Sequence, residues 1–306
     1  MNIVIFGGSG FIGGALARKL AARGHHLTLP VRDREKAKEL IVLPNTDVAA
    51  FDPSAMRGAA SALAGADAVI NLVGILNERS GGEFVRVHSE FTRVLCDTCA
   101  SQKARRLVHI SALNAGAGAP SEYLRSKGKA EQAIRAAAVR HVIIRPSVVI
   151  GPGDSLINMF ARLARLSPVL LLPCASLMVQ PIAIDDLTEV IAHAAESGDE
   201  DGKTLSAAGP EKMLLAEVAR RTIAAAGMRR PVVGLGPSLS YCLGALTEAL
   251  PGVHFFSRDN CLSARIPTTV GGENDARRIV GELTSLDAVL ARMFEGAPPP
   301  PARRRR

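Results

Sequence analysis

A glycine-rich turn near the start of the chain constrains its fold more than any other feature. Gly7, Gly10 and Gly13 stand at G-x-x-G-x-x-G spacing. An apolar run at residues 2–6 precedes them, and residues 11–23 after them have the periodicity of an amphipathic helix. Glycines at this junction let a pyrophosphate approach the backbone, where the helix N-terminus offers free N–H donors and partial positive charge. The pattern predicts a dinucleotide-binding unit, and the alternative is a merely flexible turn.

The end of the second predicted strand, residues 26–31, determines which dinucleotide is favoured. An acidic residue there would hydrogen-bond the ribose 2′-hydroxyl and favour NAD(H). Arg32 follows the strand instead, with Arg34 close by. A guanidinium binds a 2′-phosphate through two parallel hydrogen bonds, which favours NADP(H). Asp33 would serve a ribose if the strand ended one residue later, so NAD(H) remains the alternative.

Strand and helix patterns alternate through the first half of the chain and then become irregular after Gly151. The alternation predicts an α/β fold, a Rossmann-type doubly wound parallel sheet, with a smaller, irregular C-terminal α/β lobe. Predicted strands lie at 2–6, 26–31, 47–51, 68–73, 106–111, 141–145 and 204–207. Predicted helices lie at 11–23, 32–40, 53–63, 83–102, 121–138, 184–196 and 214–226. We therefore expect a Rossmann domain at 1–175, a smaller lobe at 176–297 with some elements returning to the core, and a disordered Pro/Arg tail at 298–306.

Charge and composition argue against nucleic acid as a partner. The formal net charge is +8, but Arg303, Arg304, Arg305 and Arg306 supply four of these charges at the very end of the chain. Aromatic residues make up only 4% of the chain, and tryptophan is absent. Proteins that bind single-stranded nucleic acid stack bases on aromatic side chains, so we expect no nucleic-acid partner.

Cysteine usage and hydropathy point to a cytoplasmic protein. Cys96 and Cys99 form a C-x-x-C inside a predicted helix, and no second pair follows, so packing is favoured over metal binding. Free thiols and the absence of a leader predict the cytoplasm. No apolar run reaches the eighteen residues or so of a membrane span. Residues 163–179 and 237–256 are unusually apolar; we expect them to pack in the core, and a bilayer surface or a partner is the alternative.

A tyrosine and a lysine offer candidate catalytic chemistry. Tyr123 and Lys127 are spaced i, i+4 on the predicted helix at 121–138, so they share one helix face. A nearby ammonium would lower the pKa of the phenol and make it a usable acid or base near neutral pH. Spacing alone equally permits an ordinary pair on a helix.

Several short motifs together resemble the short-chain dehydrogenase/reductase family, in its extended and atypical branches. They are the glycine loop, Asn71 in V-I-N-L-V-G-I-L, His109 in H-I-S-A-L, Y-x-x-x-K at 123–127, and Arg145 in R-P-S-V-V. Residues 71–78, 108–114, 121–131 and 144–154 further resemble the NADPH-holding accessory subunits of respiratory complex I and their bacterial homologues. The similarity extends to about residue 230 and then thins.

The resemblance implies a cofactor site built from the loops that follow the strands. Its residues would be Gly7, Ser9, Gly10, Phe11, Ile12 and Gly13 at the pyrophosphate, Arg32 at the 2′-phosphate, Asp52 near the adenine, Asn71, Val73 and Gly74 after the fourth strand, Tyr123 and Lys127 at the nicotinamide ribose, and Pro146, Ser147 and Val148 at the nicotinamide.

One departure from the family pattern separates two hypotheses for the function. Catalytic members carry a serine or threonine after the fifth strand, but this chain has only Ser111, followed by Ala112 and Leu113. Losing one oxyanion donor typically lowers the rate roughly a hundred- to thousandfold. The preferred hypothesis is an NADP(H)-holding support subunit of a membrane-associated respiratory or quinone-related complex, with little or no turnover. The alternative is an active NADP-dependent oxidoreductase, epimerase or dehydratase in which Tyr123, Lys127 and Ser111 act on a small carbonyl or sugar-nucleotide substrate.

Overall fold

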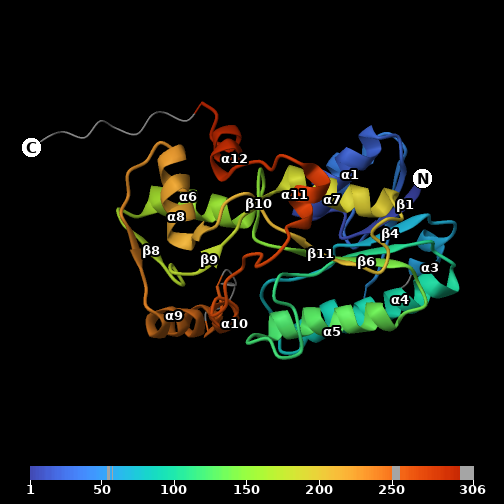
Figure 1. Ribbon diagram of the computed structural model, residues 1–306, viewed down its shortest axis with the longest axis horizontal. Coiled ribbons are helices and arrows are strands. Elements are labelled where there is room, and N and C mark those ends of the chain that lie inside the picture. Colours follow the sequence, from blue (N-terminus) through green and yellow to red (C-terminus); the bar gives the residue numbers. More distant parts are fainter. Residues whose placement is uncertain (54–55, 57, 250–255, 297–306) are drawn as a thin grey trace, which may run out of the picture.

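The computed structural model describes residues 1–53, 56, 58–249 and 256–296, and a seven-stranded parallel sheet forms its centre (Figure 1). The strand order is β11-β6-β5-β4-β1-β2-β3. The chain thus runs outward from β1 in one direction, returns to β4 beside β1, and continues in the other. This is the doubly wound arrangement that the sequence predicts, and the order reverses between β1 and β4. The strands are β1 (Asn2–Phe6), β2 (His26–Val31), β3 (Thr46–Ala50), β4 (Ala68–Asn71), β5 (Leu107–Ile110), β6 (His141–Pro146) and β11 (Thr204–Ala207).

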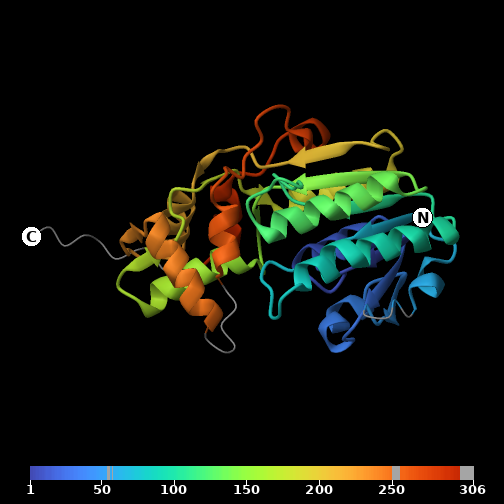
Figure 2. The same cartoon turned by 90° about the horizontal axis from the view of Figure 1, so that it is seen from below.

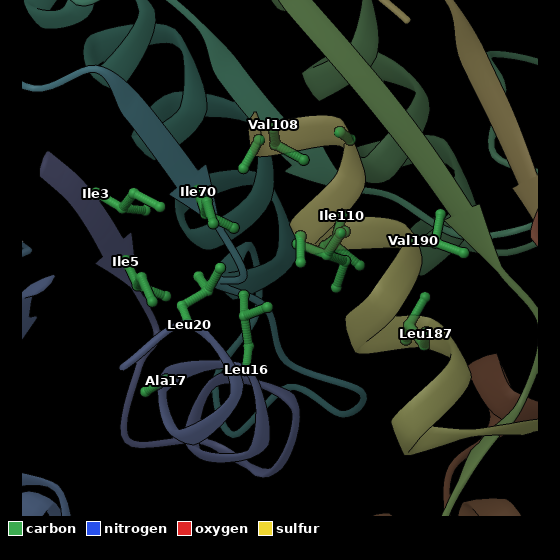
Figure 3. Close-up of a cluster of buried hydrophobic side chains, with 14 of the residues drawn as sticks. Ile3, Ile5, Leu16, Ala17, Leu20, Ile70, Val108, Ile110, Leu187 and Val190 are labelled. Atoms are coloured by element: carbon green, nitrogen blue, oxygen red, sulfur yellow. The ribbon is translucent and has the colours of Figure 1, made fainter. Parts of the chain in front are cut away.

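Helices cover both faces of the sheet. On one face lie α1 (Phe11–Ala22), α7 (Ile184–Glu196) and α11 (Asp275–Val280); on the other lie α3 (Ala59–Leu63), α4 (Phe91–Ser101) and α5 (Glu122–Ala136). Figure 2 shows α4 and α5 side by side along the sheet. Because successive strand residues point to opposite faces, each face has its own apolar core. Figure 3 shows the first core, where side chains from the strands, α1 and α7 meet.

A second lobe lies beside the sheet, with a core of its own. It contains α6 (Ser155–Leu166), α8 (Leu215–Ala225), α9 (Pro237–Ala249), α10 (Arg258–Ser263) and α12 (Leu286–Met293). Three two-stranded ladders accompany these helices: β7 (Val149–Ile150) with β10 (Ile182–Ala183), β9 (Met178–Val179) with β12 (Met213–Leu214), and β8 (Leu170–Leu172) with β13 (Val232–Gly234). Phe160, Val218 and Leu290 bring α6, α8 and α12 together in the lobe core.

The two lobes interleave along the chain. Helix α6 falls within the range 1–175 that the sequence assigns to the Rossmann domain, yet it packs in the core of the second lobe. Helix α7 and strand β11 then return to the central sheet. The tail expected to be disordered, 298–306, lies outside the described residues.

Local hydrogen bonds correct several predicted elements. The helix expected at 32–40 is a 3-10 turn at Glu35–Ala37 followed by the short α2 (Lys38–Ile41), because the Asp33 carboxylate accepts the Glu35 N–H and turns the chain. The strand expected at 68–73 ends at Asn71, whose side chain accepts the Val73 N–H. The helix expected at 83–102 begins as a π-helix at Val85–Glu90, and of the helix expected at 53–63 the described part shows only α3.

The cysteine pair is structural. Cys96 and Cys99 are buried on α4, and burial raises the pKa of each thiol to about 12, so both remain protonated at neutral pH. No group of three metal-ligating side chains occurs within the described part of the chain. None of the helices described there has the length and apolar character needed to cross a membrane.

Three phenylalanine rings fix the second face of the sheet, and Phe6→Ala tests their contribution. The Phe6 ring centroid lies 5.2 Å from that of Phe51 and 5.9 Å from that of Phe91, and its side chain is fully buried. We expect Phe6→Ala to lower the free energy of unfolding by about 3–5 kcal/mol, measured by denaturant titration. Leu76→Ala is the control, because Leu76 is 63% exposed. Equal, small shifts for both variants would contradict this assignment.

Candidate nucleotide site

The glycine loop forms a tight, open cradle at the carboxyl end of β1. Gly7 has φ +82°, and its carbonyl accepts the N–H of Gly10 at 3.0 Å. A Cβ at Gly13 would overlap the Gly7 carbonyl and stand 2.7 Å from the Cα of Gly8, so helix α1 packs closely against the loop. Ser9 and Gly10 are exposed, and no side chain in the described part of the chain caps α1. The first N–H groups of α1 are therefore available to an anion, which fits a bound pyrophosphate.

The end of β2 presents a cation. Arg32 is exposed directly after the strand, and no carboxylate among the described residues forms an ion pair with it. The neighbouring Asp33 points back into its own turn, where Oδ1 accepts the Glu35 N–H at 3.0 Å. Asp52, expected near the adenine, is half-buried after β3. Phe11 and Ile12 are half-buried at the start of α1.

Asn71 shapes the loop after β4. It is fully buried, its Nδ2 donates to the Thr92 hydroxyl at 3.1 Å, and its Oδ1 accepts the Val73 N–H at 3.1 Å. The loop then places Gly74 beside α5, because a Cβ there would stand 3.2 Å from the Lys127 Nζ. Val73, Gly74 and Lys127 are thus brought together, while the side-chain amide of Asn71 holds the loop that carries them.

Lys127 is buried, and its environment changes its titration. The Nζ donates to the Ile110 carbonyl at 2.9 Å, and 5% of the residue is exposed. Burial lowers the pKa of Lys127 to about 8, against the opposing charge of Glu131. A pKa near 8 leaves the ammonium protonated in most molecules at neutral pH.

Tyr123 departs from the titration expected for a catalytic phenol. Its half-buried ring makes edge contacts with Phe84 and His88, at centroid distances of 5.9 Å and 5.6 Å. Burial raises the pKa of Tyr123 to about 12, and the negative charge of Asp259 adds to the rise. The sequence predicted a shift in the opposite direction, from Lys127. That prediction is wrong for this structure, because burial and Asp259 determine the shift.

Two histidines lie beside Lys127, and the sequence analysis assigned neither a role. The His88 Nε2 accepts the Ile75 N–H at 3.0 Å, so the ring is neutral and its Nδ1–H donates to the Ser126 hydroxyl at 2.8 Å. Burial, reinforced by the charge of Lys127, lowers the pKa of His88 to about 2. His109 is 1% exposed, and its ring nitrogens have no hydrogen-bond partner among the described residues. In the sequence, only the place of His109 in the H-I-S-A-L motif pointed to this residue.

Ser111 is held by a buried carboxylate. Its hydroxyl donates to the Oε1 of Glu131 at 2.6 Å, and Glu131 is 1% exposed. Arg145 donates to both Glu131 oxygens, at 2.8 and 2.6 Å, and Arg135 donates to Oε2 at 2.9 Å. Burial favours a higher pKa for Glu131, but hydrogen bonds from Arg145 and Ser111 outweigh it and lower the pKa. The Ser111 proton is therefore engaged within the fold.

The position two residues further on is apolar and covered. Leu113 is 7% exposed and packs against Ala208 and Val270. The fold thus gives a substrate carbonyl no hydroxyl at position 113, the place where the family pattern leads one to expect it.

The second lobe closes against the tyrosine end of α5. The Asp259 carboxylate of α10 accepts the N–H groups of Glu122 and Tyr123 at 2.7 and 3.1 Å, and the Ser263 hydroxyl donates to that of Ser121 at 2.8 Å. These contacts bring α10, from the far part of the chain, onto the N-terminal turn of α5.

The loops after β5 and β6 are hydrogen-bonded to residues 267–268, which follow α10. Pro146 and Ser147 are buried and Val148 is half-buried. The Ser147 hydroxyl donates to the Thr268 carbonyl at 2.8 Å, and the Asn114 amide donates to the Pro267 carbonyl at 2.9 Å.

Comparisons with known proteins agree with this geometry. Residues 7–155 match the model of a family described as NAD(P)H-binding. The chain is 29% identical over 219 residues to mouse NADH dehydrogenase (ubiquinone) 1 alpha subcomplex subunit 9, mitochondrial, a match that covers 69% of this chain and 57% of the relative. It is 30% identical over 184 residues to a ceramide reductase of Caulobacter vibrioides, covering 60% of this chain and 57% of the relative. The chain therefore matches little more than half the length of each.

A solved structure supports the fold over nearly the whole chain. The UDP-glucuronic acid 4-epimerase of Bacillus cereus, in complex with UDP-glucuronic acid and NAD, superimposes with a TM-score of 0.74 at 17% identity, covering 96% of this chain and 98% of the epimerase. The predicted resemblance to short-chain dehydrogenase/reductase proteins and to the complex I accessory subunit is confirmed. The chain is an NAD(P)-binding protein of the Rossmann type.

Gly13→Ala tests the cradle. We expect this variant to weaken NADPH binding by at least about tenfold, equivalent to 1.4 kcal/mol, because the new methyl group forces α1 away from the loop. Gly14→Ala is the matched control, since a Cβ there meets nothing nearer than an Arg18 nitrogen at 3.4 Å. Isothermal titration calorimetry would compare them. Similar affinities for both variants would show that the nucleotide does not use this loop.

Proposed function

We propose that this protein holds NADP(H) with little or no turnover and serves as a nucleotide-carrying support subunit of a membrane-associated respiratory or quinone-related complex. The observation that carries the proposal is the hydrogen bond from the Ser111 hydroxyl to Glu131, at 2.6 Å. A serine committed to a buried carboxylate has no proton to offer to a substrate carbonyl.

The remaining groups support the same interpretation. Acid–base catalysis is most effective when the pKa of the catalytic group lies near the working pH. A phenol with a pKa of about 12, as at Tyr123, is far from that range. Leu113 supplies no replacement donor. Tyr123 and Lys127 then serve as hydrogen-bonding partners of the cofactor ribose, a role that needs no proton transfer.

NADP(H) is the cofactor we propose, with NAD(H) as the alternative. Arg32 is exposed and unpaired within the described structure at the end of β2, while one Asp33 oxygen is occupied by its own turn. A bound nucleotide stabilises the fold by mass action without any reaction. Such linkage suits a subunit whose task is to keep an assembly folded.

The similarity to the mouse subunit, whose name places it in an NADH dehydrogenase subcomplex, supports the partner that we propose. We propose a cytoplasmic chain that attaches peripherally, at the inner face of the membrane, to a complex of that type. All five cysteines are free thiols, as in a reducing compartment.

An active enzyme is the second candidate, and one comparison favours it. The Caulobacter relative is named a ceramide reductase. Tyr123 and Lys127 are retained on one face of α5, and the pKa of Lys127 is lowered to about 8. In this alternative the protein is an NADP-dependent oxidoreductase or epimerase, with Tyr123 as acid or base toward a carbonyl or sugar-nucleotide substrate.

Arg32→Gln tests the cofactor preference. Charge-assisted hydrogen bonds contribute roughly 1.5–3 kcal/mol, so we expect NADPH to bind about ten- to a hundredfold more weakly and NADH to be unaffected. Arg93→Gln removes the same charge from the exposed side of α4 and serves as the control. Parallel titrations by fluorescence would measure both affinities. If Arg32→Gln weakens NADH as much as NADPH, Arg32 does not read the 2′-phosphate.

Turnover separates the two candidates. We expect the parent protein to bind NADPH and to leave it unoxidised when quinones, long-chain ketones or sugar nucleotides are added. Tyr123→Phe should weaken NADPH binding several-fold and change no rate, since one hydrogen bond contributes about 1 kcal/mol. Tyr241→Phe, at the other tyrosine of the chain, is the control. NADPH oxidation that Tyr123→Phe abolishes and Tyr241→Phe preserves would establish the enzyme instead.

A further inference from the structure

Helix α9 is built with its apolar side outward. The residues buried against the protein are Ser240, Gly244 and Thr247. Leu239 and Leu246, which lie seven positions apart on one exposed side of the helix, are 62% and 58% exposed. Surface helices usually place large apolar residues toward the core and polar ones toward water. Here the arrangement is inverted, so the leucines lack a partner within the described structure.

Specific contacts hold α9 in this orientation. The Ser240 hydroxyl accepts the Cys174 N–H at 3.1 Å, and the Thr247 hydroxyl donates to the Phe256 carbonyl at 2.6 Å. A Cβ at Gly244 would stand 2.7 Å from the backbone of Ser257, so only glycine permits this approach to α10. Turning the leucines inward would break these contacts.

The neighbouring ribbon of β8 and β13 continues the apolar surface. Leu171 pairs with Val233 across the two strands, and these residues are 58% and 47% exposed. Leu170 and Leu172, which alternate with Leu171, point into the lobe core instead. The Leu235 N–H donates to the Leu172 carbonyl at 2.9 Å. Leu235 lies between β13 and α9, so this bond joins the start of α9 to the ribbon.

Leu166, at the end of α6, completes the surface and is 75% exposed. We call the surface formed by Leu166, Leu171, Val233, Leu239 and Leu246 the distal face. In Figure 1, β8 and α9 lie at the end of the second lobe away from the seven-stranded sheet. The two apolar segments noted in the sequence, 163–179 and 237–256, thus contribute exposed side chains here rather than only core.

The charge close to the distal face is mainly positive, because the one carboxylate on α9, Glu248, is paired with Arg258. Residues 155–176 and 227–247, which carry all five of its members, contain no aspartate or glutamate. They contain four arginines, all exposed, and no described carboxylate forms an ion pair with any of them: Arg162, Arg165, Arg229 and Arg230. The Arg230 Nε donates to the Ala164 carbonyl at 3.2 Å, so these cations lie beside the C-terminal end of α6.

We propose that the distal face docks on the surface of an anionic lipid bilayer. Exposed leucines would enter the boundary between headgroups and acyl chains, and the arginines would contact lipid phosphates. Leucine and valine are under-represented among the residues that anchor protein interfaces, and the distal face consists of leucine and valine alone, with arginines beside it. The leucine-and-arginine composition favours a bilayer over an acidic protein partner. Docking needs no nucleotide turnover, so this inference and the proposed function can fail separately.

Vesicle co-sedimentation of the full chain provides the test. We expect binding to vesicles of phosphatidylcholine with phosphatidylglycerol, at least about tenfold weaker binding to phosphatidylcholine alone, and loss of binding as salt is raised. Absence of binding to the anionic vesicles, or equal binding to both kinds, would overturn the proposal.

Substitutions then locate the surface. The double variant Leu239→Ser with Leu246→Ser should bind anionic vesicles at least about tenfold more weakly, since two apolar side chains no longer enter the bilayer. Val42→Ser, at a valine that is 81% exposed after α2, is the control and should bind vesicles like the parent. NADPH affinity should be the same in all three proteins, because neither the distal face nor Val42 belongs to the candidate nucleotide site.

The terminal arginines are a rival source of vesicle binding. Changing Arg303, Arg304, Arg305 and Arg306 to glutamine should leave most of the binding intact, whereas Arg162→Gln with Arg165→Gln should weaken it several-fold. Binding that vanishes with the tail substitutions and survives both distal-face variants would overturn the proposal. The proposal would also be overturned if the distal-face variants bound anionic vesicles like the parent and lost only the ability to bind a purified acidic protein.

Discussion

The buried carboxylate of Glu131 holds α5, β5 and β6 together at one part of the candidate nucleotide site. It projects from α5 and accepts hydrogen bonds from Ser111 at the end of β5 and from Arg145 on β6. Removing one partner of a buried pair leaves a charge without compensation, so such clusters tolerate little change. The register of α5 over the sheet, and with it the position of Lys127, depends on this cluster. The hydrogen bond to Glu131 that orders this part of the site also engages the Ser111 hydroxyl, which a reaction at a substrate carbonyl would need.

Low polarity dominates the chemistry around Lys127. His88 and His109 flank it as neutral rings, because burial and the neighbouring ammonium both oppose a second positive charge. The Lys127 ammonium donates a hydrogen bond to the Ile110 carbonyl. A cation held in this way is suited to hydrogen-bond a ribose hydroxyl, and the surrounding groups have little capacity to relay protons at neutral pH.

The sequence predicted those parts of the molecule that depend on neighbours along the chain. The glycine loop, the order of strands and helices, and the placement of Arg32 after β2 all follow from local spacing. The titration of Tyr123 could not be predicted, because it is shifted by burial and by Asp259, which lies 136 residues further on. The engagement of Ser111 likewise requires knowing that Glu131 faces the end of β5. Apolar content drew attention to residues 237–256, but only the contacts of Ser240 and Gly244 show which side of α9 faces out.

The pKa of Tyr123 depends on both lobes, because Asp259 of the second lobe contributes to it. It accepts the N–H groups of Glu122 and Tyr123 at the start of α5, and its charge adds to the rise in the pKa of the Tyr123 phenol that burial causes. A substitution at position 259, in a helix of six residues far from every recognisable motif, therefore changes the titration of Tyr123. Among related proteins, changes in the appended lobe can thus alter this tyrosine while the glycine loop stays the same.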